Sequence, residues 1–274
     1  MPFRRALLLS SLFALAACGR EASPPAAESP APTPAATASA PPAPAAAVLS
    51  DVVETRPDYI VGISYPQAAA RDPGLAALLH DYAERQRAQL MQAVQALGGQ
   101  KPRAPYDLSL QFRMLADSPQ VVAVAADGSM YTGGAHGIPL VERFVWLPQR
   151  HEALTAERLF AAPGAWKVLS DASREQLLAA LSRQLDDDGL EGAVRAEQQQ
   201  LRSRMIADGT RPQAEDFSRF EPVVDADGRI RALRFVFPPY QVAPYVDGTQ
   251  TVEIPAVTLL PLLAPAYRPL FRGG

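Results

Sequence analysis

Two short stretches hold the residue types best suited to contact a ligand. Residues 131–137, YTGGAHG, offer glycines that leave backbone amides accessible and one imidazole that can take or give a proton. Residues 237–248 place Tyr240 and Tyr245 among prolines, and such tyrosines are rigid amphipathic contacts for a sugar ring or a protein. The predicted ligand-binding residues are Tyr131, Thr132, Gly133, Gly134, His136, Tyr240 and Tyr245.

Each stretch also has a purely structural interpretation. Glycines between two strands often mark a bulged hairpin connection, and prolines with tyrosines can form a packed turn. A catalytic interpretation makes His136 the general base of a hydrolase or transferase. That base needs a nucleophile and an orienting carboxylate, for which Ser129, Thr132 and Glu142 are local candidates without a recognisable spacing. We therefore assign no catalytic residue.

The sequence shows no metal-binding pattern, so neither a metal nor a cofactor is expected. His80, His136 and His151 do not have the spacing of a helical zinc motif. The acidic run 186–188 lacks the alternating oxygen ligands of a calcium loop and is better explained as the solvated start of a helix.

The N-terminus predicts export and lipid anchoring. Residues 1–17 combine two arginines with a short apolar run and small residues, as in a secretory signal peptide, and Cys18, the chain's one cysteine, follows directly. This arrangement resembles a bacterial lipobox, in which the thiol of Cys18 is lipidated. The alternative is an ordinary cleaved signal with an incidental cysteine.

Residues 18–50 predict a disordered linker, because alanine and proline dominate and offer nothing to bury. Gly19 in place of aspartate after Cys18 favours the outer membrane of a Gram-negative cell, so we expect attachment to its periplasmic face. The formal net charge of −3 gives no sign of nucleic-acid binding.

The remaining sequence predicts an α+β fold in two joined modules, residues 51–118 and 119–274. Alternating apolar residues predict strands at 59–65 and 108–114, and segments apolar on both faces predict interior strands at 121–126 and 138–147. These strands are expected in one largely antiparallel sheet, with a turn at Asp127-Gly128. Helical spacing predicts a helix of about 24 residues between Asp72 and Gly98, and another over 166–185. Residues 186–211 predict a solvated helical insertion.

The C-terminal part predicts strands at 217–224 and 230–237 around a turn at 225–228, then a strand at 252–254 and a short helix. The strings YTGGAHG and FPPYQVAPYVDGTQTVEIP, in this order, resemble the extracytoplasmic domain of RsiV-type anti-sigma factors, which also accompanies the catalytic domain of PdaC-type peptidoglycan deacetylases. Residues 59–117 resemble the smaller module that precedes it in those proteins.

The resemblance implies a binding role, because RsiV-type domains bind lysozyme and the deacetylases catalyse with a separate domain. The leading hypothesis is a lipid-anchored, non-enzymatic module of the cell envelope that recognises lysozyme-like muramidases or peptidoglycan fragments. Alternatives are the His136-dependent glycan enzyme and a structural lipoprotein that serves envelope assembly.

Overall fold

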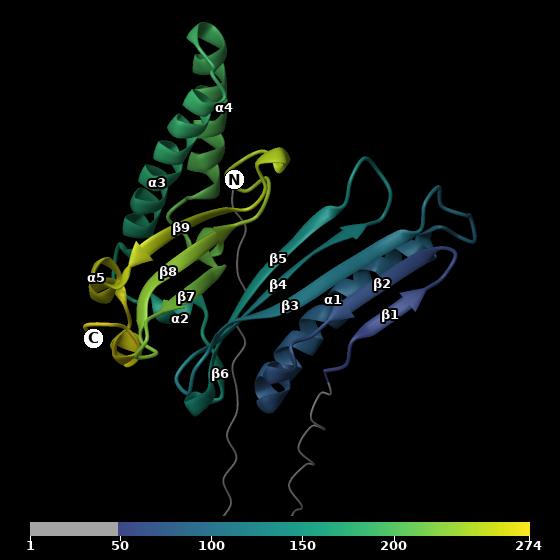
Figure 1. The fold of residues 1–274 in the computed structure, drawn as a ribbon, viewed down its shortest axis with the longest axis horizontal. Helices are drawn as coiled ribbons and strands as arrows, with labels where there is room; N and C mark the ends of the chain where they lie inside the picture. Colours follow the sequence, from purple (N-terminus) through teal and green to yellow (C-terminus); the bar gives the residue numbers. More distant parts are fainter. Residues whose placement is uncertain (1–48) are drawn as a thin grey trace, which may run out of the picture. The chain divides into compact units, whose positions relative to one another are not determined.

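The structure, a computed structural model, describes residues 49–274 (Figure 1). The predicted signal peptide, Cys18 and nearly all of the predicted linker lie outside the described residues, so they stay predictions. Within residues 49–274, no helix combines the length and the apolar character needed to cross a bilayer.

The first half of the described chain forms a six-stranded sheet whose strand order follows the sequence. Its strands are β1 (Val52–Thr55), β2 (Tyr59–Ser64), β3 (Tyr106–Asp117), β4 (Val122–Tyr131), β5 (Ile138–Leu147) and β6 (Glu152–Ala153). Neighbours are antiparallel except β2 and β3, which are parallel because helix α1 (Pro73–Ala96) connects them. The predicted largely antiparallel sheet and 24-residue helix are confirmed.

Helix α1 begins where the sequence predicts, at a capping aspartate. The Oδ1 of Asp72 accepts hydrogen bonds from the backbone N–H groups of Gly74 at 2.9 Å and Leu75 at 3.2 Å. Its Oδ2 accepts the indole N–H of Trp146 at 2.8 Å, which ties the start of the helix to β5. The helix covers one face of the sheet (Figure 1), and its apolar stripe is buried there, including Leu75, Leu79 and Leu90.

The predicted turn at Asp127-Gly128 is wrong, because β4 runs straight through both residues and pairs with β3 and β5. Gly128 allows β4 to approach β3 closely and does not reverse the chain. A Cβ at this position would overlap the backbone carbonyl of Ser109 on β3. The chain reverses at residues 132–137, between β4 and β5.

The second half builds a three-stranded antiparallel sheet from β7 (Phe220–Val224), β8 (Ile230–Phe237) and β9 (Gln250–Pro255). The predicted turn is confirmed, since the amide of Gly228 donates to the carbonyl of Asp225 at 3.0 Å. Leu233, Phe235 and Phe237 share one face of β8 and are fully buried. The α helices of this half are α2 (Ala156–Leu159), α3 (Ala165–Asp187), α4 (Gly192–Gly209) and α5 (Ala256–Leu259).

Short 3-10 turns complete the described chain and connect the larger elements. They are η1 (Gln67–Arg71), η2 (Pro148–Arg150), η3 (Ala214–Phe217), η4 (Tyr245–Asp247), η5 (Leu260–Leu262) and η6 (Pro265–Leu270). Helices, a mixed six-stranded sheet and an antiparallel three-stranded sheet confirm the α+β class.

Helices α3 and α4 lie side by side as a hairpin (Figure 1). The predicted helical insertion is confirmed, but the acids Asp186–Asp188 end a helix and do not start one. Gly189, at φ 64°, stops α3: its amide donates to the carbonyl of Asp186, and the amide of Leu190 donates to that of Leu185. The negative charge at a helix C-terminus is offset by Arg195, whose Nη1 lies 2.9 Å from Asp186.

An ionic link joins the two sheets. Arg143 of β5, whose side chain is only 7% exposed, contacts Glu221 of β7 at 2.6 Å and Asp127 of β4 at 2.8 Å. Glu221 also contacts Arg234 of β8 at 3.4 Å. The predicted division at residue 118 stays a prediction, although the strands on either side of it, β3 and β4, pair within one sheet.

Candidate functional site

The two stretches singled out by the sequence lie on different halves of the fold and meet in space. Residues 132–137 connect β4 to β5, whereas residues 238–249, with the short helix η4, connect β8 to β9. We call the first the glycine loop and the second the tyrosine segment. Both are connections between strands at ends of their sheets (Figure 1).

Three aromatic side chains converge where the two connections meet. The hydroxyl of Tyr240 lies 3.1 Å from Nε2 of His136. The rings of His136 and Tyr245 stack with centroids 4.4 Å apart and planes inclined by 19°, and the rings of Tyr240 and Tyr245 lie 5.6 Å apart. We call these three residues the aromatic cluster, and all three are exposed.

The hydrogen bonds of His136 indicate its tautomer. Nδ1 lies 2.9 Å from the carbonyl oxygen of Gly137, which can only accept, so Nδ1 carries the proton. Nε2 then accepts the hydroxyl proton of Tyr240. Both ring nitrogens are thus occupied, and among the described residues no carboxylate orients the imidazole. The arrangement holds the ring as a contact surface.

Two of the three sequence candidates for a catalytic partnership with His136 lie within strands of the first sheet. Ser129 lies within β4, opposite Ser109 and Pro139. Glu142 accepts the backbone N–H of its neighbour Arg143 at 2.9 Å and approaches the guanidinium of Arg219 at 3.7 Å. A glycan enzyme based on His136 stays a hypothesis.

Tyr240 adopts a backbone conformation that tyrosine disfavours, with φ at 73°. A tight turn imposes it: the amide of Tyr240 donates to the carbonyl of Ala243 at 2.9 Å, and the amide of Gln241 donates to that of Pro238 at 3.1 Å. Such a conformation costs on the order of 1 kcal/mol for a residue with a Cβ. Tyr240 bears this conformational cost, and its hydroxyl is the group that contacts His136.

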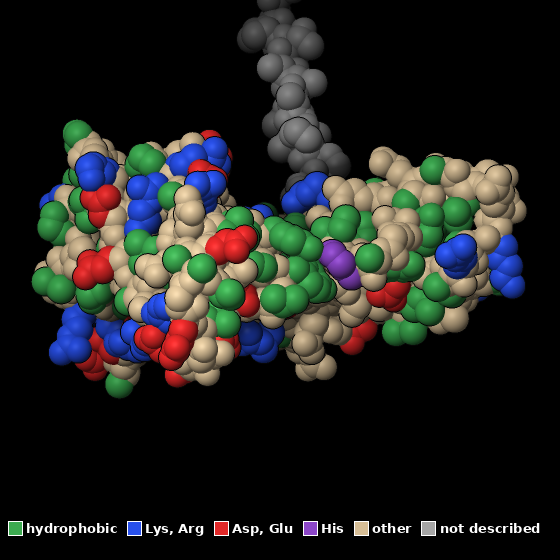
Figure 2. Space-filling model, turned by 90° about the horizontal axis from the view of Figure 1, so that it is seen from above, with side chains coloured by type: hydrophobic (Ala, Val, Ile, Leu, Met, Phe, Trp, Pro, Cys, Tyr) green, Lys and Arg blue, Asp and Glu red, His purple; other side chains and the backbone are tan. Residues whose placement is uncertain are grey.

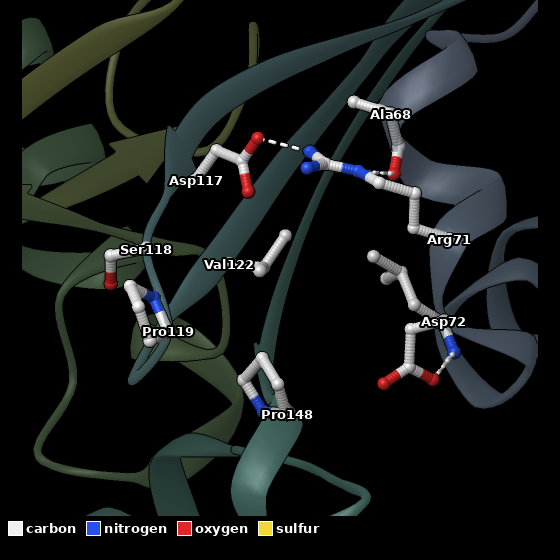
Figure 3. A pocket seen from close by; sticks show the side chains of 9 residues that line it. Ala68, Arg71, Asp72, Asp117, Ser118, Pro119, Val122 and Pro148 are labelled. Atoms are coloured by element: carbon white, nitrogen blue, oxygen red, sulfur yellow. Dashed lines mark hydrogen bonds and ion pairs between the residues drawn. The ribbon is translucent and has the colours of Figure 1, made fainter.

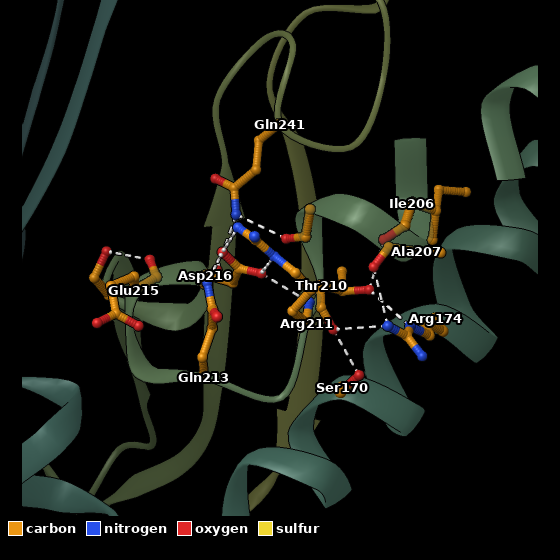
Figure 4. A network of polar contacts seen from close by, with 12 residues as sticks. Ser170, Arg174, Ile206, Ala207, Thr210, Arg211, Gln213, Glu215, Asp216 and Gln241 are labelled. Carbon is orange, nitrogen blue, oxygen red and sulfur yellow. Dashed lines mark hydrogen bonds and ion pairs between the residues drawn. The ribbon is translucent and has the colours of Figure 1, made fainter. Parts of the chain in front are cut away.

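Helix α4 and the turn after it hold the tyrosine segment in place (Figure 4). The side-chain amide of Gln241 donates to the carbonyls of Gly209 and Asp216, both at 2.9 Å. Gly209 lies against the backbone of Gln241 so closely that a Cβ there would overlap its carbonyl. The same network fixes the end of α4, because the hydroxyl of Ser170 on α3 donates to the carbonyl of Thr210 at 2.6 Å.

A second anchor lies just after Tyr245. Asp247 forms an ion pair with Arg202 of α4, and the two side chains are 11% and 10% exposed. The side-chain amide of Gln184 on α3 donates to Asp247 at 3.3 Å, and that of Gln250 donates to its backbone carbonyl at 2.7 Å. Sequence analysis missed these supports, although Arg202 lies one turn before the buried Ile206, on the inner face of α4.

Three of the remaining predicted residues, Tyr131, Gly133 and Gly134, form a separate group, and Thr132 is a half-buried residue of the same loop. The hydroxyl of Tyr131 donates to the carbonyl of Gly134 at 3.3 Å, and its ring meets that of Tyr106 edge to face, with centroids 6.5 Å apart. Gly133 and Gly134 have φ of 97° and 105°, which only glycine adopts readily. The structure thus places His136, Tyr240 and Tyr245 together, and Tyr131 with the glycines.

A cavity of about 450 Å³ lies beside the start of α1, on the first sheet (Figure 3). Arg71 and Asp117 face each other across it as an ion pair, and Asp72, which also lines it, caps α1. These charged groups are already matched, so the cavity has no unpaired charge with which to select a ligand. Within residues 49–274, no group of three or more His, Cys, Asp or Glu side chains is placed to hold a metal ion.

Burial perturbs two tyrosines that pack between α1 and the first sheet, away from the candidate site. Loss of solvation raises the pKa of Tyr65 and that of Tyr82 to about 12. Both rings pack on Phe112, Tyr65 stacked at 4.7 Å and Tyr82 edge-on at 6.2 Å. These groups report on the packing of the first sheet.

Each half of the described chain matches a known protein family. Residues 53–139 match the family described as deacetylase PdaC, and residues 160–256 match the protein family of unknown function DUF3298. The chain thus joins a region similar to the PdaC family to a region similar to the DUF3298 family. This pairing confirms the predicted resemblance, and it places His136 in the match to the first family and both clustered tyrosines in the match to the second.

One solved structure supports the same fold. The crystal structure of a DUF3298 family protein from Pseudomonas aeruginosa PAO1 matches with a TM-score of 0.51 at 17% identity, over 83% of this chain and 95% of that chain. A DUF3298 family member from Bacteroides fragilis NCTC 9343 matches with a TM-score of 0.48 at 15% identity, over 80% and 93%. No curated protein matches the chain in sequence.

Proposed function

We propose that the chain is a non-enzymatic binding module of the bacterial cell envelope and that the aromatic cluster contacts a lysozyme-like muramidase. One observation carries this proposal: His136, Tyr240 and Tyr245 come from two domains, meet in van der Waals range and remain exposed. Exposed tyrosines held by a rigid framework are typical of protein contact sites. The pairing of a PdaC-type domain with a DUF3298 domain supports an envelope role.

Exposed apolar side chains next to the cluster in sequence favour a protein partner. Val246, after Tyr245, is 89% exposed, and Ile138, two residues beyond His136, is 60% exposed. Figure 2 shows hydrophobic side chains gathered beside a histidine in the middle of one face, whereas Lys, Arg, Asp and Glu gather over the end that carries α3 and α4. An apolar centre of this kind is what a protein partner desolvates.

A peptidoglycan fragment is the second candidate ligand. The nearly parallel rings of His136 and Tyr245 together present a broad aromatic surface, and a sugar ring can stack on such a surface through its C–H groups. The two ligands make different demands on the cluster. A glycan needs the rings alone, whereas a protein partner also covers the neighbouring Val246.

We further propose that the module is exported and held at the periplasmic face of the outer membrane by lipid on Cys18. The basis is the N-terminal sequence alone, in which a signal-like stretch ends at the cysteine and a proline-rich linker follows. Palmitate labelling tests this, with loss of label expected in Cys18→Ala. A protein recovered from the cytosol with its first residues uncut contradicts the proposal.

Binding to immobilised lysozyme and to purified sacculi tests the main proposal. We expect the chain to bind lysozyme, and Tyr245→Ala to weaken binding about 30-fold, as when an interface hot spot is removed. Val246→Ser should weaken it less, and Val257→Ser, which alters a valine 76% exposed on α5, should leave it unchanged. Retention on sacculi with loss only in the ring variants identifies the glycan ligand instead. Binding to neither at micromolar concentration contradicts both.

A further inference from the structure

A second cavity lies at the other end of the glycine loop. It has a volume of about 380 Å³, within the range of sites for small molecules, and we call it the loop cavity. Its lining residues are Pro102, Arg103, Ala104, Tyr106, Tyr131, Gly133 and Gly134. None of the three residues of the aromatic cluster lines it, so the two sites can be tested separately.

The residues that line the loop cavity carry several hydrogen-bond donors that have no partner within residues 49–274. Arg103 is exposed and forms no ion pair within residues 49–274. The hydroxyl of Tyr106 and the amides of Gly133 and Gly134 likewise make no hydrogen bond to any described residue. The lining contains no Asp or Glu, so its one formal charge is positive although the whole chain carries −3.

The walls of the loop cavity are aromatic and firmly placed. Tyr106 and Tyr131 meet at an interplanar angle of 89°, and Tyr131 also donates to the carbonyl of Gly134. A Cβ at Gly133 would stand 3.7 Å from the hydroxyl of Tyr106, on the lining of the cavity. A side chain at this position would therefore lie in contact with the tyrosine hydroxyl, which glycine leaves uncovered.

These groups together match one chemical class. A guanidinium binds the planar carboxylate through two parallel N–H donors, and successive amides near positive-φ glycines form an anion-binding concavity. The tyrosine rings offer contact to the body that carries the charge. We infer that the loop cavity binds the carboxylate of a small organic acid, of which an acidic sugar and the C-terminus of a short peptide are the two sources.

Titration of the full-length, ¹⁵N-labelled chain with two matched pairs of probes tests the inference. Glucuronate is compared with glucose, and N-acetyl-alanyl-alanine with its C-terminal amide. We expect at least one carboxylate to shift the amide signals of Gly133 and Gly134 with saturation below about 10 mM, and its neutral partner to leave them unchanged. The pair that responds identifies the source of the carboxylate.

Variants of Arg103 test whether its guanidinium binds the carboxylate or whether the charge of the chain as a whole decides the affinity. Arg103→Gln should weaken carboxylate binding at least about tenfold, Arg103→Lys should restore part of it, and Arg204→Gln, an equal change of charge on the exposed face of α4, should have no effect. Equal binding of charged and neutral probes overturns the inference. Unchanged affinity in Arg103→Gln also overturns the inference. An equal response to inorganic phosphate, or no response to any probe, does the same.

Discussion

The two connections that meet at the aromatic cluster are held in opposite ways. The tyrosine segment is fastened to α3 and α4 by Gln241 and by the buried pair of Asp247 with Arg202. Apart from the contact of His136 with Tyr240, the hydrogen bonds of the glycine loop are local, from Tyr131 to Gly134 and from His136 to Gly137. One side of the cluster is preorganised and the other is adaptable, so we expect His136 to adjust to a ligand while the tyrosines stay fixed.

The largest effect is expected from removing the buried anchor of the tyrosine segment. Arg202→Met leaves Asp247 buried without its cation and should lower the free energy of unfolding by about 3 kcal/mol. Amide hydrogen exchange should accelerate over residues 238–248 but not over residues 132–137. Arg204→Met, at an exposed position of the same helix, is the control. Equal acceleration in both connections would mean that they are not held independently.

Glycine substitutions compare the support of the tyrosine segment on α4 with the glycine loop itself. Gly209→Ala forces a Cβ against the backbone of Gln241 and should cost about 2 kcal/mol of unfolding free energy. Gly134→Ala meets open space and carries only the strain of its positive φ, about 1 kcal/mol. Urea denaturation measures both. A larger loss at Gly134 would reverse the assignment of the rigid and adaptable sides.

Alkaline pH should lower the free energy of unfolding through a tyrosine that packs on the sheet carrying the glycine loop. Burial raises the pKa of Tyr82 to about 12, so between pH 10 and 12 the unfolded state loses this proton first. The unfolded state then binds fewer protons, and stability falls as the pH rises through that window. Tyr82→Phe should abolish up to about 2 kcal/mol of this loss and leave the pH dependence below pH 9 unchanged. Denaturation at pH 8 and pH 11.5 measures the difference.

The smallest effect concerns strain in the tyrosine segment. Tyr240→Gly relieves the positive φ and should change the unfolding free energy by less than about 1 kcal/mol, while Tyr240→Ala keeps the strain and loses the ring contacts. Both should lose binding to the partner of the aromatic cluster. If Tyr240→Gly instead destabilises the chain more than Tyr240→Ala does, the residue is held there for folding and not for contact.

Much of the fold could be predicted because its long elements have clear periodicity. The stripe from Leu75 to Leu90 predicts α1 correctly, and Asp72 predicts its start. Asp127-Gly128 was mistaken for a turn because these residue types favour turns, whereas packing against Ser109 on β3 decides their conformation. A close approach between strands leaves no local signal in the sequence.

The candidate site could be predicted only in part. Residue types single out His136, Tyr240 and Tyr245, but His136 and Tyr240 are 104 positions apart, and nothing local predicts that they meet. The supports at Gln241 and Asp247 depend on partners from α3 and α4. Residues 186–211 predict only a solvated helical insertion, because Arg202, which supports the tyrosine segment, cannot be told from an ordinary solvated side chain in the sequence.

The ionic link at Arg143 bears on how the two sheets could come apart. Its guanidinium lies almost out of reach of water, between a carboxylate of its own sheet and Glu221 of the other. Each of these two groups also keeps a partner within its own sheet, Arg143 with Asp127 and Glu221 with Arg234. Separating the sheets would therefore break the link between them without leaving either charge unpaired.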